Sequence, residues 1–140
     1  MIDRKVLGMA GEKLAAVYLK LNGHKIMARN FRKPWGEIDL ISTSPDGTLV
    51  FTEIKSTLIE EADKAPSPSD HMNFKKIRNL RRSAEFFSNK FPELSRHGWR
   101  IDFISIRIPE EIVGKGNLYP PLLLTRLLKC CEVELWENAV

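Results

Sequence analysis

The residues whose types and spacing suggest chemistry are Asp39, Glu53 and Lys55, which lie on two neighbouring stretches of alternating side chains. Such alternation over residues 36–41 and 49–55 is typical of β-strands. The Ser-Pro-Asp-Gly sequence between these stretches is typical of a tight turn, with proline second and glycine last. We therefore predict a β-hairpin with one acidic residue on its first strand and an acidic and a basic residue on its second.

The turn also predicts which residues face each other across the hairpin. A three-residue loop followed by an antiparallel ladder places Asp39 opposite Glu53. The same register places Glu37 opposite Lys55, and all four side chains share one face because strand side chains alternate. Directly opposed side chains have Cβ atoms about 5 Å apart, so we expect the carboxylates and the amine to lie close together.

Two carboxylates at this separation indicate a cation site. Like charges about 4 Å apart repel by roughly 4 kcal/mol at intermediate dielectric, and a divalent ion between them removes this repulsion. Mg²⁺ binds oxygen ligands and often uses one or two carboxylates together with water and substrate phosphate. We therefore predict that Asp39 and Glu53 form half of a site for Mg²⁺ (or Mn²⁺). Lys55 would hold a phosphate oxygen or orient the attacking water.

A plainer interpretation is that Lys55 neutralises Glu37 and Glu53 across a solvated face, as cross-strand charge pairs often do. Two apolar neighbours argue against it. Leu49 and Phe51 alternate onto the same face as these charges, and charged groups that extend an apolar face are costly to desolvate. The sequence therefore favours a functional role and leaves the plainer interpretation open.

Two helices are predicted around this hairpin. Apolar residues recur at helical spacing over residues 3–22, and a glycine follows. After a polar, proline-containing loop over 56–70, a second helix is predicted from Asp70 to Phe91, with Ser69 or Asp70 as its N-cap.

Further segments complete an α/β pattern. The passage 26–31 is extended, and residues 99–108 are apolar on both faces, which predicts an interior strand ended by a proline. The segment 122–131 fits either a helix or a strand. With 140 residues and 43 % hydrophobic composition, the chain has enough apolar side chains for one core. We predict a single domain over residues 1–140.

Composition also limits where the protein works. The sequence has no run of about 18 apolar residues and no signal-peptide pattern, so we expect no membrane segment and a cytoplasmic location. Cys130 and Cys131 are adjacent, a spacing that matches neither a zinc site nor a redox pair, and we expect both to be reduced. His24, His71 and His97 are scattered and receive no role.

The charge of the chain favours a polyanionic partner, because lysine and arginine exceed aspartate and glutamate by 22 to 18. The first half of the second predicted helix carries a basic cluster: Lys75, Lys76, Arg78, Arg81 and Arg82. These side chains would neutralise backbone phosphates of a nucleic acid, which gives affinity without sequence readout. A solvated basic face that serves solubility is the alternative. Trp35, Trp99 and Trp136 are of a type that more often packs in a core or at an edge than stacks on bases, and only Trp35, just before the first hairpin strand, lies near enough to the predicted site to suggest substrate contact.

Seven short motifs spread along nearly the whole chain carry a resemblance to one family. They are Gly11-Glu12, Asn30-Phe31-Arg32, Gly36-Glu37-Ile38-Asp39-Leu40-Ile41, Phe51-Thr52-Glu53-Ile54-Lys55, Lys76 with Ala84, Arg100-Ile101-Asp102-Phe103 and Glu137-Asn138-Ala139. Together they resemble the YraN family, which is similar to archaeal Holliday-junction resolvases and belongs with the PD-(D/E)XK nucleases. The resemblance implies a restriction-endonuclease-like α/β core, in which a mixed central sheet with an antiparallel hairpin is flanked by helices. It also implies a homodimer, as in resolvase-like relatives.

The resemblance further implies roles for individual residues. Asp39 and Glu53 would be metal ligands, with the backbone carbonyl of Ile54 as a third. Lys55 would be the catalytic lysine, and Glu12 would contribute from the first helix.

The surroundings of these residues are implied in the same way. Glu37 would either support the ligands or only pair with Lys55, and Arg32 would join the basic helix in binding nucleic acid. One departure stands out, because the family usually has an arginine two residues after the motif lysine and this chain has Ser56 and Thr57 there. The phosphate contact of that arginine is therefore missing.

We thus expect a Mg²⁺-dependent endonuclease that hydrolyses phosphodiester bonds in DNA, with branched or structured DNA implied by the resolvase likeness alone. One alternative is a non-catalytic nucleic-acid-binding module on the same scaffold, which needs no metal. The other is a protein-interaction domain whose basic face meets an acidic protein and which forms no salt-sensitive complex with DNA.

Overall fold

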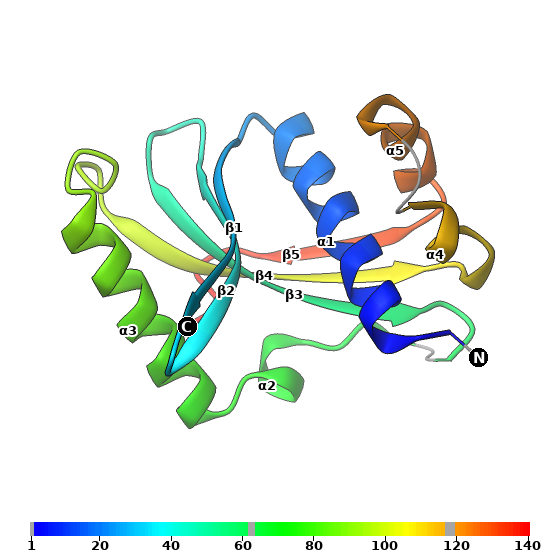
Figure 1. Cartoon of the computed structure of the whole chain (residues 1–140), viewed down its shortest axis with the longest axis horizontal. Helices are drawn as coiled ribbons and strands as arrows, with labels where there is room; N and C mark the ends of the chain where they lie inside the picture. Colours follow the sequence, from blue (N-terminus) through cyan, green and yellow to red (C-terminus); the bar gives the residue numbers. More distant parts are fainter. Residues whose placement is uncertain (1, 62–63, 117–119) are drawn as a thin grey trace.

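The computed structural model describes residues 2–61, 64–116 and 120–140 as a five-stranded mixed sheet with helices on both faces (Figure 1). In chain order the elements are α1 Arg4–Leu21, β1 Lys25–Lys33, β2 Gly36–Thr43, β3 Leu49–Leu58, α2 Pro68–His71, α3 Phe74–Lys90, β4 Trp99–Ile108, α4 Glu110–Gly116, α5 Pro121–Leu128 and β5 Glu132–Trp136. The strands lie side by side in this same order, β1 to β5. Among the described strands, β3 and β4 pair in parallel and the other neighbours pair antiparallel. The crossover connection between β3 and β4 contains α2 and α3.

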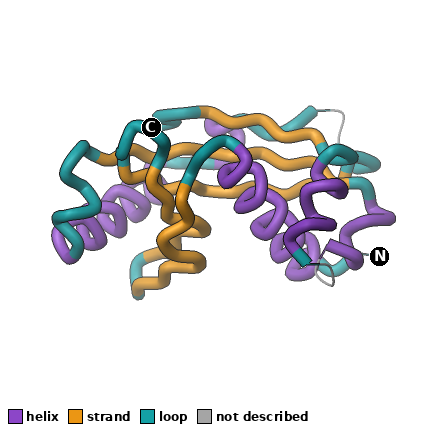
Figure 2. Tube along the Cα trace, turned by 90° about the horizontal axis from the view of Figure 1, so that it is seen from above, coloured by secondary structure: helices purple, strands orange, loops and turns teal. Residues whose placement is uncertain are grey.

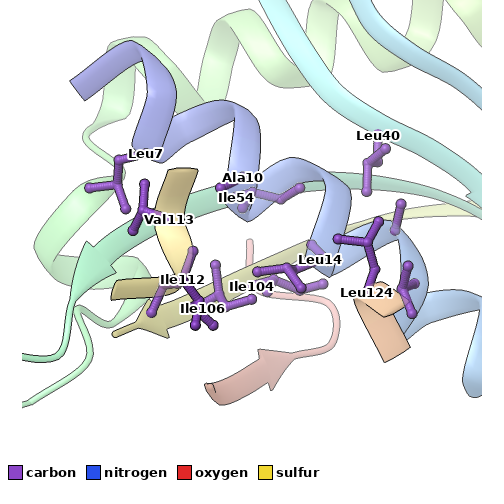
Figure 3. Close-up of a cluster of buried hydrophobic side chains, with 14 of the residues drawn as sticks. Leu7, Ala10, Leu14, Leu40, Ile54, Ile104, Ile106, Ile112, Val113 and Leu124 are labelled. Atoms are coloured by element: carbon purple, nitrogen blue, oxygen red, sulfur yellow. The ribbon is translucent and has the colours of Figure 1, made fainter. Parts of the chain in front are cut away.

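The helices divide the core in two because alternate strand residues face opposite sides of the sheet. On β4, Ile104, Ile106 and Ile108 face α1, α4 and α5, while Ile101 and Phe103 face α3. Figure 3 shows the first cluster, in which side chains from α1, α4 and α5 meet those of the sheet. Both faces of the middle strands are thus covered, as their continuous apolar runs predict.

The predicted hairpin forms, and its register is confirmed over the part that pairs. The β2–β3 ladder runs from Thr43 opposite Leu49 to Leu40 opposite Thr52, which is the register that the turn predicts. The first half of β2 then leaves β3 and pairs with β1 alone, so the β1–β2 hairpin bends out of the row of strands toward α3 (Figure 2).

This divergence overturns one predicted pair. Glu37 lies opposite Arg32 of β1 and forms an ion pair with it, Arg32 Nε to Glu37 Oε2 3.5 Å. Lys55 instead pairs in register with Ser105 of β4. The placement of Glu37 opposite Lys55 is therefore wrong, because the ladder ends before it reaches them.

The crossover also differs from the predicted loop and helix start. β3 continues to Leu58, the short helix α2 occupies Pro68–His71, and residues 62–63 of the predicted loop lie outside the described residues. Asn73, and not Ser69 or Asp70, caps α3 by accepting from the Lys76 backbone N–H at 2.9 Å.

The C-terminal part of the structure decides whether residues 122–131, which fit either a helix or a strand, are helical. The segment from residue 122 belongs to the helix α5, and a fifth strand, β5, follows it and pairs antiparallel with β4. α4 and β5 had no clear sequence signal. No helix in the described ranges combines the length and apolarity that a membrane crossing requires.

One glycine sets how closely α1 approaches the sheet. Gly11 is buried, and a Cβ atom built there would lie 2.8 Å from the Ser56 Cβ and 3.3 Å from Ile106 Cγ2. Such distances leave no room for a side chain. The backbone of α1 therefore rests directly on β3, which brings the next residue, Glu12, to the sheet.

Candidate functional site

The centre of the site is a contact between the Asp39 and Glu53 carboxyl groups. Where β2 leaves β3, the Asp39 side chain replaces the lost backbone partner, because its Oδ2 accepts from the Ile54 N–H at 2.8 Å. Glu53 lies one residue earlier on β3, is only 7 % exposed, and is hydrogen-bonded to Asp39. The structure thus brings together the two acids that the sequence singled out.

Burial controls the protonation of this pair. Burial and the charge of Asp39 together raise the pKa of Glu53 to about 8, against the opposing effect of nearby Lys76. Burial also raises the pKa of Asp39, but the hydrogen bond from the Ile54 N–H counteracts it. At neutral pH Glu53 is therefore protonated, and its O–H donates a hydrogen bond to the Asp39 carboxylate. This arrangement avoids two adjacent buried charges.

A lysine and a histidine close the site from α2 and α3. The Lys76 Nζ lies 3.4 Å from Glu53 Oε1 and 2.9 Å from His71 Nε2. Burial and the charges of Lys76 and Lys55 lower the pKa of His71 to about 4. His71 is therefore neutral, and its Nε2 accepts the hydrogen bond because an ammonium group can only donate.

Sequence reasoning had placed Lys76 on an outward basic face and had given His71 no role. In the structure Lys76 is half-buried and points at the acids. Met72 and Asn73 separate the short helix α2, which ends at His71, from α3, which carries Lys76, so no helical periodicity relates the two side chains. Their contact depends on tertiary packing and had no signal in the sequence.

Two further carboxylates meet through Asn30. Its side-chain nitrogen donates to Glu12 Oε2 at 3.3 Å and to Glu37 Oε1 at 3.1 Å. Asn30 has φ of 51°, a left-handed conformation that asparagine tolerates better than most residues. Burial raises the pKa of Glu12, followed by the charges of Asp39 and Glu37. Glu12 thus belongs to the same acidic region as Asp39 and Glu37. The sequence sign that Asn30 has a special role is that an asparagine stands inside a segment predicted to be extended.

A pocket of about 430 Å³ opens beside the acidic pair on the α3 side. Asp39, Glu53 and Lys76 line it together with Trp35 and Asn79. A smaller pocket of about 170 Å³ lies on the α1 side of Asp39, next to Glu12 and Asn30. Asp39 therefore borders both spaces.

The predicted nucleic-acid-binding residues separate into groups. Lys75 is exposed and lines the larger pocket next to Lys76. Arg78 and Arg82 border a different pocket on the outer side of α3, and the Arg82 guanidinium also stacks 4.0 Å from the centre of the Trp35 ring. Arg32 is exposed beside Glu37.

The donor set fits a divalent ion held by two carboxylates. Among the residues that the structure describes, no three His, Cys, Asp or Glu side chains are arranged around one ion position. Asp39 and Glu53 alone supply the one or two carboxylates that Mg²⁺ commonly uses with water and phosphate. Burial and then the charge of Asp39 raise the pKa of Glu53, and such an ion would offset the repulsion from Asp39.

The thiols stand apart from this site. Both cysteines are free; Cys130 is exposed, and Cys131 is half-buried with its Sγ 3.5 Å from the Leu127 carbonyl oxygen. Burial raises the pKa of Cys131 to about 12, so its thiol stays protonated.

The fold and site define a mixed α/β domain with a buried carboxylate pair at the point where two strands separate. The profile of Uncharacterised protein family UPF0102 matches residues 11–106. A "UPF0102 protein" of Desulforamulus reducens is 34 % identical over 110 residues, which cover 79 % of this chain and 88 % of the relative. A "UPF0102 protein" of Syntrophomonas wolfei is 35 % identical over 116 residues, or 80 % and 90 % of the two chains. A relative from Thermodesulfovibrio yellowstonii is 38 % identical over 101 residues, or 71 % and 84 %. The chain therefore belongs to UPF0102, the YraN family.

Proposed function

We propose that this protein is a metal-dependent endonuclease that hydrolyses phosphodiester bonds in DNA on a restriction-endonuclease-like core. The observation that carries the proposal is the buried contact of Asp39 and Glu53, with the pKa of Glu53 raised to about 8, in the wall of a pocket that also holds lysines. Burying two carboxylates together is unfavourable unless a cation or proton compensates. Perturbed acids in a pocket are typical of functional sites.

The backbone supports the proposed ligand set of Asp39, Glu53 and the Ile54 carbonyl oxygen. In a strand the N–H and C=O of one residue point to the same side. Because the Ile54 N–H reaches Asp39, the Ile54 carbonyl is directed toward the gap that β2 leaves. Mg²⁺ or Mn²⁺ bound there would activate a water molecule and polarise the scissile phosphate.

The remaining side chains take supporting roles in this proposal. Lys76 supplies positive charge beside the carboxylates, where an attacked phosphate would gain negative charge. Lys55 is proposed as the catalytic lysine from the family resemblance, and in the structure its charge acts on His71 next to Lys76. Glu12 lines the pocket on the α1 side of Asp39 and Glu37 lines the pocket on the α3 side, and both, joined by Asn30, would accept hydrogen bonds from water. Lys75, Arg78, Arg82 and Arg32 contact backbone phosphates.

DNA is the proposed partner because of this excess of positive charge around an acidic centre. Branched or otherwise structured DNA is proposed from the resolvase likeness, and a homodimer from the same likeness. A cytoplasmic location is consistent with a DNA substrate.

A non-catalytic nucleic-acid-binding module is the second candidate. The observation that favours it is the Lys76 ammonium group, which lies 3.4 Å from Glu53 and gives that carboxyl a partner without any metal. This candidate predicts salt-sensitive DNA binding that does not change when metal is added.

Cleavage and metal binding together test the proposal. The purified protein is incubated with four-way junction, forked, single-stranded and duplex DNA in Mg²⁺, Mn²⁺ or EDTA, and Mn²⁺ binding is measured by calorimetry. We expect cleavage with Mg²⁺ or Mn²⁺ only, and loss of cleavage and of Mn²⁺ heat in Glu53→Gln and Asp39→Asn. Glu85→Gln, which changes an exposed acid on α3, serves as the matched control. Full cleavage by Glu53→Gln would refute the catalytic proposal, and DNA binding without Mn²⁺ heat would favour the binding module.

A further inference from the structure

The pocket of about 430 Å³ beside Asp39 and Glu53 also has lining residues that would bind neither a metal ion nor a phosphate. Besides its charged residues, which include Glu37, it is lined by Trp35, Asn73 and Asn79, and the Asn73 side chain already accepts a hydrogen bond from the Lys76 N–H. Phosphates and metal ions have no need of an aromatic ring, whereas a nucleobase stacks on aromatic rings and hydrogen-bonds amides. The composition of the wall therefore matches a base and its attached phosphate.

The Trp35 ring is fixed in place before any ligand binds. Its Nε1 donates to the Ser83 Oγ at 2.9 Å, and the Phe86 ring packs against it with a centroid distance of 5.9 Å. The Arg82 guanidinium lies over the ring at 4.0 Å. Trp35 borders the pocket beside Asp39 and Glu53, whereas Arg82 borders the pocket on the outer side of α3. One face of the ring is thus covered by Arg82, and Trp35, held by these contacts, is a lining residue of the pocket beside Asp39 and Glu53.

We propose that this pocket accepts one unpaired nucleotide, whose base stacks on Trp35 while its phosphate lies at Lys75 and Lys76 beside Asp39 and Glu53. This inference rests on the proposed function and specifies the feature of DNA that the site selects. A base within a continuous duplex has both faces covered by its neighbours and cannot enter a pocket. The preferred substrate therefore contains a bulged, flipped or single-stranded nucleotide at the bond to be cut. The pocket volume of about 430 Å³ lies in the range of small-ligand sites.

The arrangement also explains why the β1–β2 hairpin bends toward α3. Trp35 lies at the tip of this hairpin, and the hairpin carries it to Ser83 and Phe86 of α3. Asp39, in the middle of β2 where this strand leaves β3, and Trp35, just before β2 begins, thus line the same pocket.

Binding assays in EDTA test this inference separately from catalysis. Fluorescence anisotropy at low salt compares three labelled DNAs of one sequence: a single strand, a duplex with one bulged nucleotide and a fully paired duplex. We expect Trp35→Leu to weaken binding of the first two by about 5- to 150-fold, the range that base stacking on an aromatic ring supplies. Binding of the paired duplex should change by less than about twofold. Trp35→Phe, which keeps a ring, should retain most of the preference. Phe74→Leu, which changes a 90 % exposed aromatic residue at the start of α3 that does not line this pocket, should alter none of the three.

Several results would overturn the inference. These are equal binding of bulged and paired DNA by the wild type, an equal loss for all DNAs in Trp35→Leu, and no loss in that variant when thermal melting shows it folded. Cleavage in Mn²⁺ is measured in parallel. Selective binding without cleavage would refute only the catalytic proposal, and cleavage without Trp35-dependent selectivity would refute only the unpaired-nucleotide pocket.

Discussion

Replacing Glu53 by Gln should make the metal-free protein more stable at pH 8. In the wild type, burial and the charge of Asp39 raise the pKa of Glu53 to about 8, from an ordinary value of 4.5. Between these two values the folded chain holds a proton that the unfolded chain has released. Stability therefore falls as pH rises through this window, because the folded state binds more protons there.

The magnitude follows from the two pKa values. Each pKa unit corresponds to about 1.36 kcal/mol, so the full window amounts to roughly 5 kcal/mol, of which roughly 3 to 4 kcal/mol is lost between pH 5 and pH 8. A domain of this size is stable by only about 5 to 15 kcal/mol. Glutamine stays neutral and can still donate to Asp39, but it gives up the contact with the Lys76 ammonium at 3.4 Å. We expect a net gain of about 2 kcal/mol at pH 8 and a difference below about 1 kcal/mol at pH 5.

Urea denaturation in EDTA at pH 5, 6, 7 and 8 measures this effect for the wild type, Glu53→Gln and the exposed control Glu85→Gln. The control should follow the wild type at every pH. Added Mn²⁺ should then stabilise the wild type at pH 8 but leave Glu53→Gln unchanged. A wild-type stability that stays level or rises from pH 5 to pH 8, with Glu53→Gln following it, would refute the account of a buried, protonated acid.

Three further changes test the surroundings of the site. Lys76→Met should tighten Mn²⁺ binding about tenfold in calorimetry, or about 1.4 kcal/mol, because it removes a positive charge 3.4 Å from Glu53; weaker binding would show that the lysine does not compete with the ion. Gly11→Ala should destabilise the fold by about 1 to 3 kcal/mol in urea, and Ser56→Gly should recover much of that loss because it removes the overlapping side chain. Asn30→Ala should cost about 1 to 2 kcal/mol more than Asn30→Gly, because only glycine adopts φ of 51° without strain; equal costs would place the whole effect in the lost hydrogen bonds.

The part of the site that could be predicted from sequence is the part that local geometry determines. The turn between β2 and β3 sets the pairing of Thr43 with Leu49, and alternation along β3 then fixes the face on which Glu53 lies. Such rules need no knowledge of the rest of the chain. They placed Asp39 near Glu53 even though the ladder itself ends one pair earlier.

The same rules failed where distant parts of the chain decide the structure. Glu37 pairs with Arg32 and not with Lys55, because the β1–β2 hairpin bends away from β3 toward α3. Contacts such as the hydrogen bond from Trp35 to Ser83 hold this bend. Nothing in the alternation of β2 predicts it. The helix start also moved, because Asn73 begins α3 after the separate turn α2, and this break brings His71 to Lys76.

The electrostatics of the acidic pair argue for function over stability. Among buried groups, Glu53 is surrounded by an acid, a lysine and strand backbone, and its raised pKa means that the folded chain is weakened by this residue across neutral pH. An apolar residue of similar volume would avoid that cost, since replacing buried charged groups by well-packed apolar ones is often neutral or stabilising. Lys76 and the shared proton reduce the cost but do not remove it, because the pKa stays high with both in place. We therefore propose that the carboxylate pair is kept for a bound cation, whose attraction would turn the repulsion between Asp39 and Glu53 into binding energy.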